Sequence, residues 1–246
     1  MKLPVKGKPK KEPAGTGDAR RDRWSAHRSQ RRAELVEATI LAINEHGAGV
    51  GMDEIAAKAG ITKPVLYRHF TDKSDLYLAV GQRASEILLG RIVPTLTASG
   101  TPREIIAGII GAYLDTIEDY PELYQFMVRR SFADVETDPI YANESMVANL
   151  LSQLLGDFLA ELGLDSGGAE PYSYAVVGAV QTAGAWWLDR RTMSKERLSH
   201  HLCTVLWHAI EGLTRSVGVT LDPDVPVENI GELTAAVRPT DIRRAR

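Results

Sequence analysis

The chain has 246 residues, of which 44% are hydrophobic and 25% are charged, a balance typical of a globular protein and not of a disordered or fibrous one. Its net charge of -3 conceals an asymmetry, because residues 1–32 contain eleven Lys or Arg and only three acidic residues, which leaves -11 on the rest. A basic end on an acidic body indicates that one terminus meets a polyanion, and it argues against attraction to nucleic acid over the whole surface.

Two classes of protein are excluded by simple features of the sequence. The single cysteine, Cys203, rules out an intrachain disulfide and a CxxC metal site, and it suits a reducing cytosol. The basic N-terminus lacks the apolar stretch of a secretory signal, and the longest apolar run, 174–188, is shorter than the ~18 residues of a membrane span. We therefore expect a soluble, cytoplasmic protein with no membrane partner.

The N-terminal part is predicted to contain an arm and a first helix. Residues 1–24 combine Lys, Arg, Pro and Gly with few apolar residues, so we expect a flexible basic arm. Residues 25–47 carry apolar side chains at helical spacing, and Gly47 is a natural end for that helix. The GAGVG run at 47–51 follows no strand and does not match G-x-G-x-x-G, so it predicts a turn and not a phosphate-binding loop.

Three short elements follow at the spacing of a helix-turn-helix. A two-turn helix is predicted over 53–59 and ends at Gly60, Thr62 caps a second helix, and a longer third runs from Asp72 to about Ile92. A helix, a glycine turn and a second helix form the motif that reads DNA. The apolar residues expected to be buried between these helices are Ile55, Ile61, Leu66 and Phe70.

The second of these helices offers side chains suited to the major groove. Lys63 can donate to guanine O6 and N7, Val65 can meet a thymine methyl group, and the hydroxyls of Thr62 and Tyr67 can bond phosphate. In the alternative, Lys63 is merely solvated and the aromatic residues form a small cluster without a partner. The candidate DNA-binding residues are Thr62, Lys63, Pro64, Val65, Tyr67, Arg68, His69 and Lys73, together with Arg28, Arg31 and Arg32 of the first helix.

The run MDEIAAKAGITKPVLYRHFTDKSDLY, residues 52–77, closely resembles the signature of the TetR family of bacterial transcriptional regulators. The resemblance extends over about 32–84. It implies that residues at the positions of Lys63, Pro64, Val65, Tyr67, His69 and Lys73 face DNA or fix the recognition helix. One departure is Gly51, because many members have a Thr or Ser there that caps the helix that follows and contacts phosphate.

The remainder of the chain is predicted to be helical. Breaks are expected at 99–102, 120–121, 138–139, 165–171 and 192–194, and no stretch sustains the period of two that strands require. We predict an all-α fold: a helix-turn-helix domain of three helices over 25–82, a larger helical domain for ligand binding and dimerisation over 83–217, and a tail over 218–246. The tail has one short helical pattern near 230–237 and no strong core pattern, so mobility is expected.

The resemblance implies a ligand pocket among the middle helices and a dimer bundle from the last two, which are predicted over 171–190 and 195–217. Trp186 and Trp187 are each equally well explained by the dimer interface or by the core of one subunit. The pocket candidates could also describe a filled core. They are Tyr113, Ile117, Tyr120, Leu123, Phe126, Met127, Val147, Leu150, Leu151, Leu154, Tyr174 and Gln181, with Arg130 as an anion partner.

The long apolar stripe over 140–162 points to an elongated, lipid-like ligand. The KPVLYRHF motif with its basic arm is similar to that of actinobacterial TetR regulators of lipid metabolism, some of which sense long-chain acyl-CoA. We therefore predict a one-component regulator, a repressor, that binds a palindromic operator in double-stranded DNA as a homodimer. A hydrophobic effector, such as a long-chain acyl-CoA or a fatty acid, releases it, and no cofactor or metal is expected.

Two other functions remain open. The first is a DNA-binding protein without a ligand response. The second is an all-helical enzyme, although the sequence has no G-x-S-x-G, H-E-x-x-H or Walker loop. The one candidate metal cluster is better explained as structural residues of a packing helix, and it comprises His200, His201, Cys203 and His208.

Overall fold

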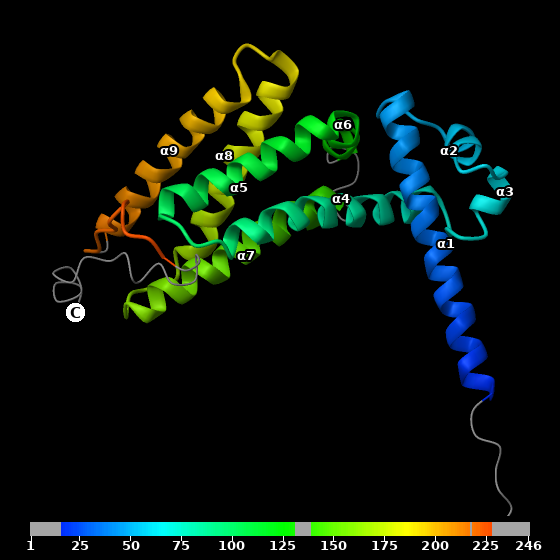
Figure 1. The fold of residues 1–246 in the computed structure, drawn as a ribbon, viewed down its shortest axis with the longest axis horizontal. Helices are drawn as coiled ribbons and strands as arrows, with labels where there is room; N and C mark the ends of the chain where they lie inside the picture. The colour runs from blue at the N-terminus through cyan, green and yellow to red at the C-terminus, as the bar shows by residue number, and fades with distance from the viewer. Residues whose placement is uncertain (1–15, 131–138, 217, 228–246) are drawn as a thin grey trace, which may run out of the picture.

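The computed structural model describes residues 16–130, 139–216 and 218–227, in which the helices form a small N-terminal unit and a larger body (Figure 1). Within these residues the regular secondary structure is helical, and one isolated antiparallel bridge joins Gly100 and Val227. The predicted all-α class, with an N-terminal helix-turn-helix and a C-terminal helical part, is confirmed.

The N-terminal unit comprises α1 (Thr16–His46), α2 (Met52–Lys58), α3 (Lys63–Leu66) and the first turns of α4 (Lys73–Leu96). Helix α1 begins nine residues earlier than predicted, so that residues 16–24 of the expected arm are helical. The basic composition was misleading here, because residues 18–46 contain no Pro or Gly and are rich in Arg and Ala, which favour a helix. Residues 1–15 lie outside the described part.

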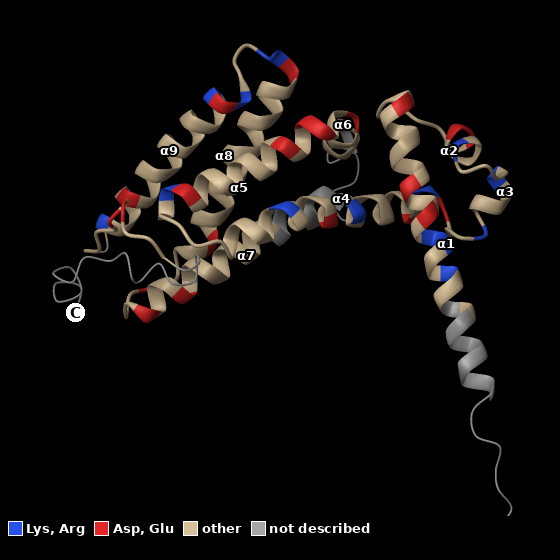
Figure 2. Cartoon of the chain, viewed as in Figure 1, with Lys and Arg blue, Asp and Glu red and all other residues tan. Residues whose placement is uncertain are grey.

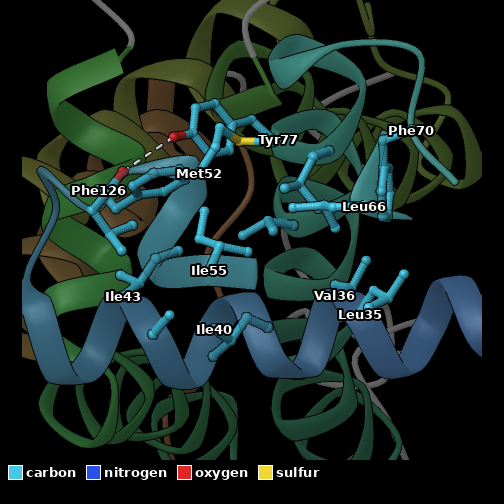
Figure 3. Close-up of a cluster of buried hydrophobic side chains, with 14 of the residues drawn as sticks. Leu35, Val36, Ile40, Ile43, Met52, Ile55, Leu66, Phe70, Tyr77 and Phe126 are labelled. Atoms are coloured by element: carbon cyan, nitrogen blue, oxygen red, sulfur yellow. Dashed lines mark hydrogen bonds between the residues drawn. The ribbon is translucent and has the colours of Figure 1, made fainter. Parts of the chain in front are cut away.

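One hydrophobic cluster holds the unit together (Figure 3). Ile55, Leu66 and Phe70 are buried in it as predicted, and Ile61 packs against it while partly buried. The hydroxyl of Tyr77 donates to the carbonyl of Val50 at 3.4 Å. The remaining labelled members come from α1, α2 and α6 and are Leu35, Val36, Ile40, Ile43, Met52 and Phe126.

Local capping explains where α3 and α4 begin and end. Thr62 precedes α3 with extended backbone, Pro64 lies in its first turn, and Asp72 accepts a hydrogen bond from the amide of Asp75 at 2.8 Å to cap α4. Helix α3 is one turn long. Beyond it, amides of residues 68 and 69 bond to carbonyls three residues back, so the predicted helix continues to Phe70 as tight turns.

The larger body comprises α5 (Pro102–Asp119), α6 (Pro121–Arg130), α7 (Pro139–Glu161), α8 (Ala169–Arg190) and α9 (Lys195–Ser216). These bounds agree with the predicted breaks, although residues 131–138, where one break was placed, lie outside the described part. Helix α4 runs from the N-terminal unit into the body (Figure 1) and continues past Pro94 to Leu96. A proline this close to the end of a helix stops it within the next turn.

The start of the C-terminal tail is packed and does not match the expected mobile segment. Val219, Leu221 and Val227 are buried against side chains of the body that include Phe158 and Trp207. Gly100 and Val227 exchange two backbone hydrogen bonds of 3.0 and 2.9 Å. The segment is irregular, so its apolar residues show no period that reveals burial in the sequence. The helix predicted near 230–237 lies outside the described residues.

Candidate DNA-binding surface and ligand cavity

The recognition helix α3 presents its N-terminal side chains to the outside of the molecule. Thr62, Lys63, Pro64, Tyr67 and Arg68 are exposed, as expected for residues that meet DNA. The hydroxyl of Thr62 makes no capping hydrogen bond to the helix. Val65 and His69 differ from the prediction because both are partly buried, so only part of each side chain can be reached from outside.

Lys63 is paired with an acidic residue of the neighbouring helix. Its Nζ lies 3.0 Å from a carboxylate oxygen of Asp53, and this partner raises the pKa of Lys63 above its ordinary value. Both side chains are well exposed, so the pair is weak and easily exchanged. Lys63 is therefore charged at neutral pH, and it must leave Asp53 to reach a base edge.

Arg32, a predicted DNA contact, is engaged by other residues of this unit. Its guanidinium donates to the carbonyl of His69 at 2.7 Å and to both carboxylate oxygens of Asp75, at 2.5 and 3.2 Å. It also lies 4.1 Å from the centre of the Phe70 ring. These contacts join α1 to the end of the recognition region and to the start of α4, and they leave the guanidinium engaged within the chain.

The other arginines of α1 are placed differently. Arg28 is exposed, and Arg31 forms an ion pair of 2.7 Å with Glu34 on the same helix. His69 lies nearby with its Nδ1 enclosed, and this atom has no hydrogen-bond partner among the described residues. Burial, and then the charges of Arg31 and Arg28, lower the pKa of His69, so its imidazole is neutral at physiological pH.

Positive side chains on α1, α3 and the start of α4 lie among acidic side chains of α1 and α2 (Figure 2). Lys73 is exposed at the first position of α4, with its Nζ 5.2 Å from the centre of the Tyr77 ring. Gly51 precedes α2, and its amide donates to the carboxylate of Glu54 at 2.5 Å. A glycine has no hydroxyl, so the phosphate contact that the resemblance implies at this position cannot come from its side chain.

The body contains an apolar cavity of about 360 Å³. Helices α4, α5, α7, α8 and α9 contribute to its wall, and Leu221 of the tail does so too. Its lining is mainly Ile, Leu and Val, and among the described lining residues the only charged one is Asp165. Six predicted pocket residues line it: Tyr113, Val147, Leu150, Leu151, Leu154 and Gln181.

A second, smaller cavity of about 90 Å³ lies next to the first, on the side of α6. It shares Tyr113, Val147 and Gln181 with the larger cavity among the predicted pocket residues. The other predicted residues on its wall are Ile117, Tyr120, Leu123 and Met127.

Three predicted pocket residues are not found on either wall. Phe126 packs edge-to-face on Tyr77 in the N-terminal core, with ring centres 4.9 Å apart. Tyr174 is exposed, and its hydroxyl lies 3.5 Å from Asn149. The side chain of Arg130 lies outside the described residues.

The sequence prediction also missed much of the cavity wall. The run Ile105–Ile110 of α5 contributes four isoleucines, and such a run is a recognisable signal of a buried helix face. Leu213 follows Leu202, Leu206 and Ile210 at helical spacing, so its burial was also recognisable, whereas Leu221 could not be assigned from any pattern. Leu213 lies at the end of α9 and Leu221 lies in the irregular tail.

The adjacent tryptophans of α8 differ in burial. Trp187 is 2% exposed, its Nε1 donates to the carbonyl of Met193 at 2.8 Å, and Arg191 lies 4.0 Å from its ring centre. Trp186 is 39% exposed. Of the two alternatives left open by the sequence, Trp187 fits the core of one subunit because it is buried. Trp186 is exposed and remains available for a dimer interface.

The remaining expectations concern membranes and metals. In the part of the chain that the structure describes, no helix combines the length and hydrophobicity needed to cross a bilayer. Over the same residues, no three His, Cys, Asp or Glu side chains lie close enough together to hold a metal ion. His200 and His201 are exposed neighbours on α9 with ring centres 5.9 Å apart.

Comparison with known families matches both parts of the chain. Residues 35–80 match the model described as bacterial regulatory proteins, tetR family, and residues 91–218 match a tetracyclin repressor-like C-terminal domain. An uncharacterised HTH-type transcriptional regulator of Mycobacterium tuberculosis is 38% identical over 202 residues, which cover 82% of this chain and 86% of the relative. The HTH-type transcriptional activator FasR of Mycolicibacterium smegmatis is 30% identical, with coverage of 84% and 94%.

Solved structures share the fold. A TetR-family regulator from Streptomyces coelicolor has a TM-score of 0.60 at 20% identity and covers 88% of both chains. The transcriptional regulator FadR from Bacillus subtilis, in complex with stearoyl-CoA, also has a TM-score of 0.60, at 16% identity, with coverage of 71% of this chain and 96% of that one.

Proposed function

Because the chain belongs to the TetR family of bacterial transcriptional regulators, we propose that it is a one-component regulator in the cytoplasm whose operator affinity is controlled by a hydrophobic effector. The apolar cavity of about 360 Å³, lined in part by α4, which begins in the DNA-binding unit, is the observation that carries this proposal. The chain divides into an arm, a DNA-binding domain over 25–82, a ligand and dimerisation domain over 83–217, and a tail.

In this proposal the recognition helix reads the bases of the operator, and neighbouring polar and basic side chains contact the phosphates of the DNA backbone. Lys63 donates to a base edge, and Thr62, Tyr67, Arg68 and Lys73 contact phosphate. The support is that these side chains are exposed on one end of the molecule, on α3 and at the start of α4 (Figure 2). Val65 and Pro64 complete the surface that enters the groove, and Arg28 and Arg31 add charge beside it.

Arg32 and His69 act differently in this proposal. Arg32 fixes the carbonyl of His69 and the carboxylate of Asp75, so these residues hold the recognition helix at its angle and do not read bases. An arginine engaged by three acceptor atoms is not free to neutralise a phosphate.

We further propose a homodimer built on the exposed faces of α8 and α9, which run side by side (Figure 1). On α8 this face carries Ala179 and Trp186, and on α9 it carries Val205, which is 61% exposed. Small residues beside an exposed aromatic suit a close, self-complementary two-fold contact. Two recognition helices about 34 to 36 Å apart would then read a palindrome.

The effector that suits the larger cavity has a long hydrocarbon part. The wall offers aliphatic side chains from five helices and few polar groups, among which Ser173 and Thr214 already donate to carbonyls of their own helices. The exposed carboxylate of Asp165 repels an anion at that part of the wall. A fatty acid or a long-chain acyl-CoA with its chain inside and its charged head outside meets these conditions.

Release from DNA would follow from linkage between the two parts of the chain. Helix α4 begins at the DNA-binding unit with Lys73 and lines the cavity with Leu88, Leu89 and Ile92. A ligand that favours another position of α4 shifts the recognition helices away from their operator spacing. To take the operator-competent population from nearly all to nearly none, the ligand needs a preference of roughly 10⁴-fold for the other state.

We propose repression as the outcome, because occupancy of a promoter suffices to block it, whereas activation needs a further contact with polymerase. The relative FasR is named an activator, which makes activation the second candidate. A reporter driven by the promoter of the protein's own gene, with and without the protein, distinguishes the two by the sign of the change.

The effector proposal is tested by footprinting that promoter with and without long-chain acyl-CoA and by thermal shifts with the same compounds. We expect a protected palindrome that is lost with acyl-CoA, and a raised melting temperature. Protection that persists while the melting temperature rises would contradict release, and an unchanged melting temperature with the whole panel would contradict the effector class.

A further inference from the structure

The two cavities are neighbours that share part of one wall. Leu88, Tyr113, Val147 and Gln181 face both the larger cavity of about 360 Å³ and the smaller one of about 90 Å³. These side chains therefore form a partition between the two cavities.

Tyr113 is one of the two polar members of this partition, the other being Gln181. It is buried, and its hydroxyl donates to that of Tyr124 at 3.3 Å. The Tyr124 hydroxyl in turn lies 3.5 Å from the backbone carbonyl of Gln181, at the long limit of a hydrogen bond. The phenol groups of Tyr113 and Tyr124 thus link α5, α6 and α8 between the two cavities.

A glycine on α8 makes room for the Tyr113 ring. A Cβ added to Gly184 would lie 2.7 Å from Cε1 of Tyr113 and 3.0 Å from its hydroxyl. The ring therefore lies directly against the helix backbone and cannot retreat toward α8. A chain end that reaches the partition must push the ring the other way and break its hydrogen bond to Tyr124.

The smaller cavity lies where the body meets the DNA-binding unit. Leu123 and Met127 of α6 line it, and the same two side chains belong to the hydrophobic cluster of the N-terminal unit. Filling the larger cavity alone leaves this contact untouched. Entry of a chain end into the smaller cavity displaces side chains that pack under the helix-turn-helix.

We infer that Tyr113 sets the effector chain length at which the protein releases DNA, an inference that rests on the proposed function. Shorter chains bind in the larger cavity and leave the operator complex intact. Chains long enough to displace Tyr113 enter the smaller cavity, whose wall includes Ala84 and Ile87 of α4 as well as α6, and so move α4 and release DNA. Length discrimination thus resides in one phenol and in the glycine that seats it.

The test uses the full chain and a series of straight-chain fatty acids that differ by two carbons. Binding is measured by calorimetry, and operator release is measured by fluorescence anisotropy. Each buried methylene should raise affinity about fourfold. For the wild type we expect this rise to stop at one chain length and operator release to begin only beyond it.

Tyr113→Ala should remove the interruption, so that affinity continues to rise about fourfold per methylene through the same lengths. Tyr113→Phe keeps the ring and removes the hydroxyl, and with it the bond to Tyr124, so it should raise the affinity of the longer chains alone. It replaces the alanine variant if that variant does not fold. The matched control is Tyr172→Ala, which removes a tyrosine that lines only the larger cavity. It should keep the interruption at the wild-type length.

The outcomes separate the two proposals. If the wild type binds fatty acids with an uninterrupted rise, or if the interruption survives in both Tyr113 variants, the partition is wrong while the effector proposal stands. If no chain binds the wild type, the proposed effector class is wrong and the inference fails with it.

Discussion

Replacing Arg32 with alanine should destabilise the N-terminal unit. The guanidinium joins three parts of the chain, because it donates to the His69 carbonyl and the Asp75 carboxylate and lies over the Phe70 ring. Residues 32 and 75 are 43 positions apart. The substitution therefore removes a long-range connection between α1 and the start of α4, and it leaves a half-buried carboxylate without its main cation.

The magnitude follows from the contacts and their exposure. A hydrogen bond to a charged group contributes roughly 1.5–3 kcal/mol when buried. The Arg32 and Asp75 side chains are 35% and 28% exposed, so solvent screening reduces this by about half. The contact with Phe70 adds about 0.5–1 kcal/mol. We expect a loss of roughly 2 kcal/mol in the free energy of unfolding, or about 4–8 °C in Tm for a chain of this size.

The neighbouring arginine supplies the control. Arg31 pairs with Glu34 on the same exposed helix face, so Arg31→Ala should lower the free energy of unfolding by less than about 0.5 kcal/mol. It should instead weaken binding to all DNA and lower the salt slope by about 0.9. Urea unfolding of both variants, with a double-mutant cycle between Arg32 and Asp75, measures the contrast. Equal losses of stability in the two variants, or a coupling energy near zero, would refute the structural role of Arg32.

Three further predictions concern other parts of the chain. Lys63→Ala should lower operator affinity about tenfold or more and leave the affinity for random DNA nearly unchanged. Asp53→Ala, which frees Lys63, should not lower operator affinity. Competition binding measures both affinities, and equal losses on operator and random DNA would show that Lys63 does not read bases. The Arg32 guanidinium holds the pKa of Asp75 below its usual 3.8, so the stabilisation from this pair is present above that pH and is lost as pH falls through the lowered pKa. In acid unfolding, Asp75→Asn should lose that part of the pH dependence of stability. A pH profile identical to that of the wild type would contradict the ion pair as its source. Ending the chain at residue 218 should lower the free energy of unfolding by at least about 3 kcal/mol, because each fully buried Val or Leu contributes roughly 1.5–3 kcal/mol. An unchanged Tm of the truncated chain would contradict the packing of the tail.

Features encoded by neighbouring residues could be predicted from the sequence. The glycine turn at Gly60, the cap at Asp72 and the breaks at the prolines that begin α5, α6 and α7 depend on backbone preferences within a few residues. Burial of Leu66 and Phe70 followed from helical spacing alone. For the same reason, the all-α class and the helix-turn-helix were within reach of the sequence.

Features that depend on distant parts of the chain were not predictable. Arg32 is a basic residue among other arginines, as is typical of a DNA contact, and only the fold brings Asp75 to it. Phe126 has the character of a pocket residue, but α6 turns it toward Tyr77 in the N-terminal core. The tail offers no period, and its burial depends on the bridge between Gly100 and Val227. In each case the partner lies too far along the sequence for a local pattern to reveal it.

The central claim is that occupancy of the apolar cavity controls the affinity for DNA. The most direct test is the anisotropy of a labelled operator duplex titrated with protein at fixed salt, with and without saturating long-chain acyl-CoA. Leu154→Trp, which fills part of the larger cavity, is the control. We predict at least a tenfold loss of operator affinity with acyl-CoA for the wild type, and unchanged affinity for the filled variant. Identical titration curves for the wild type with and without bound acyl-CoA would contradict the account.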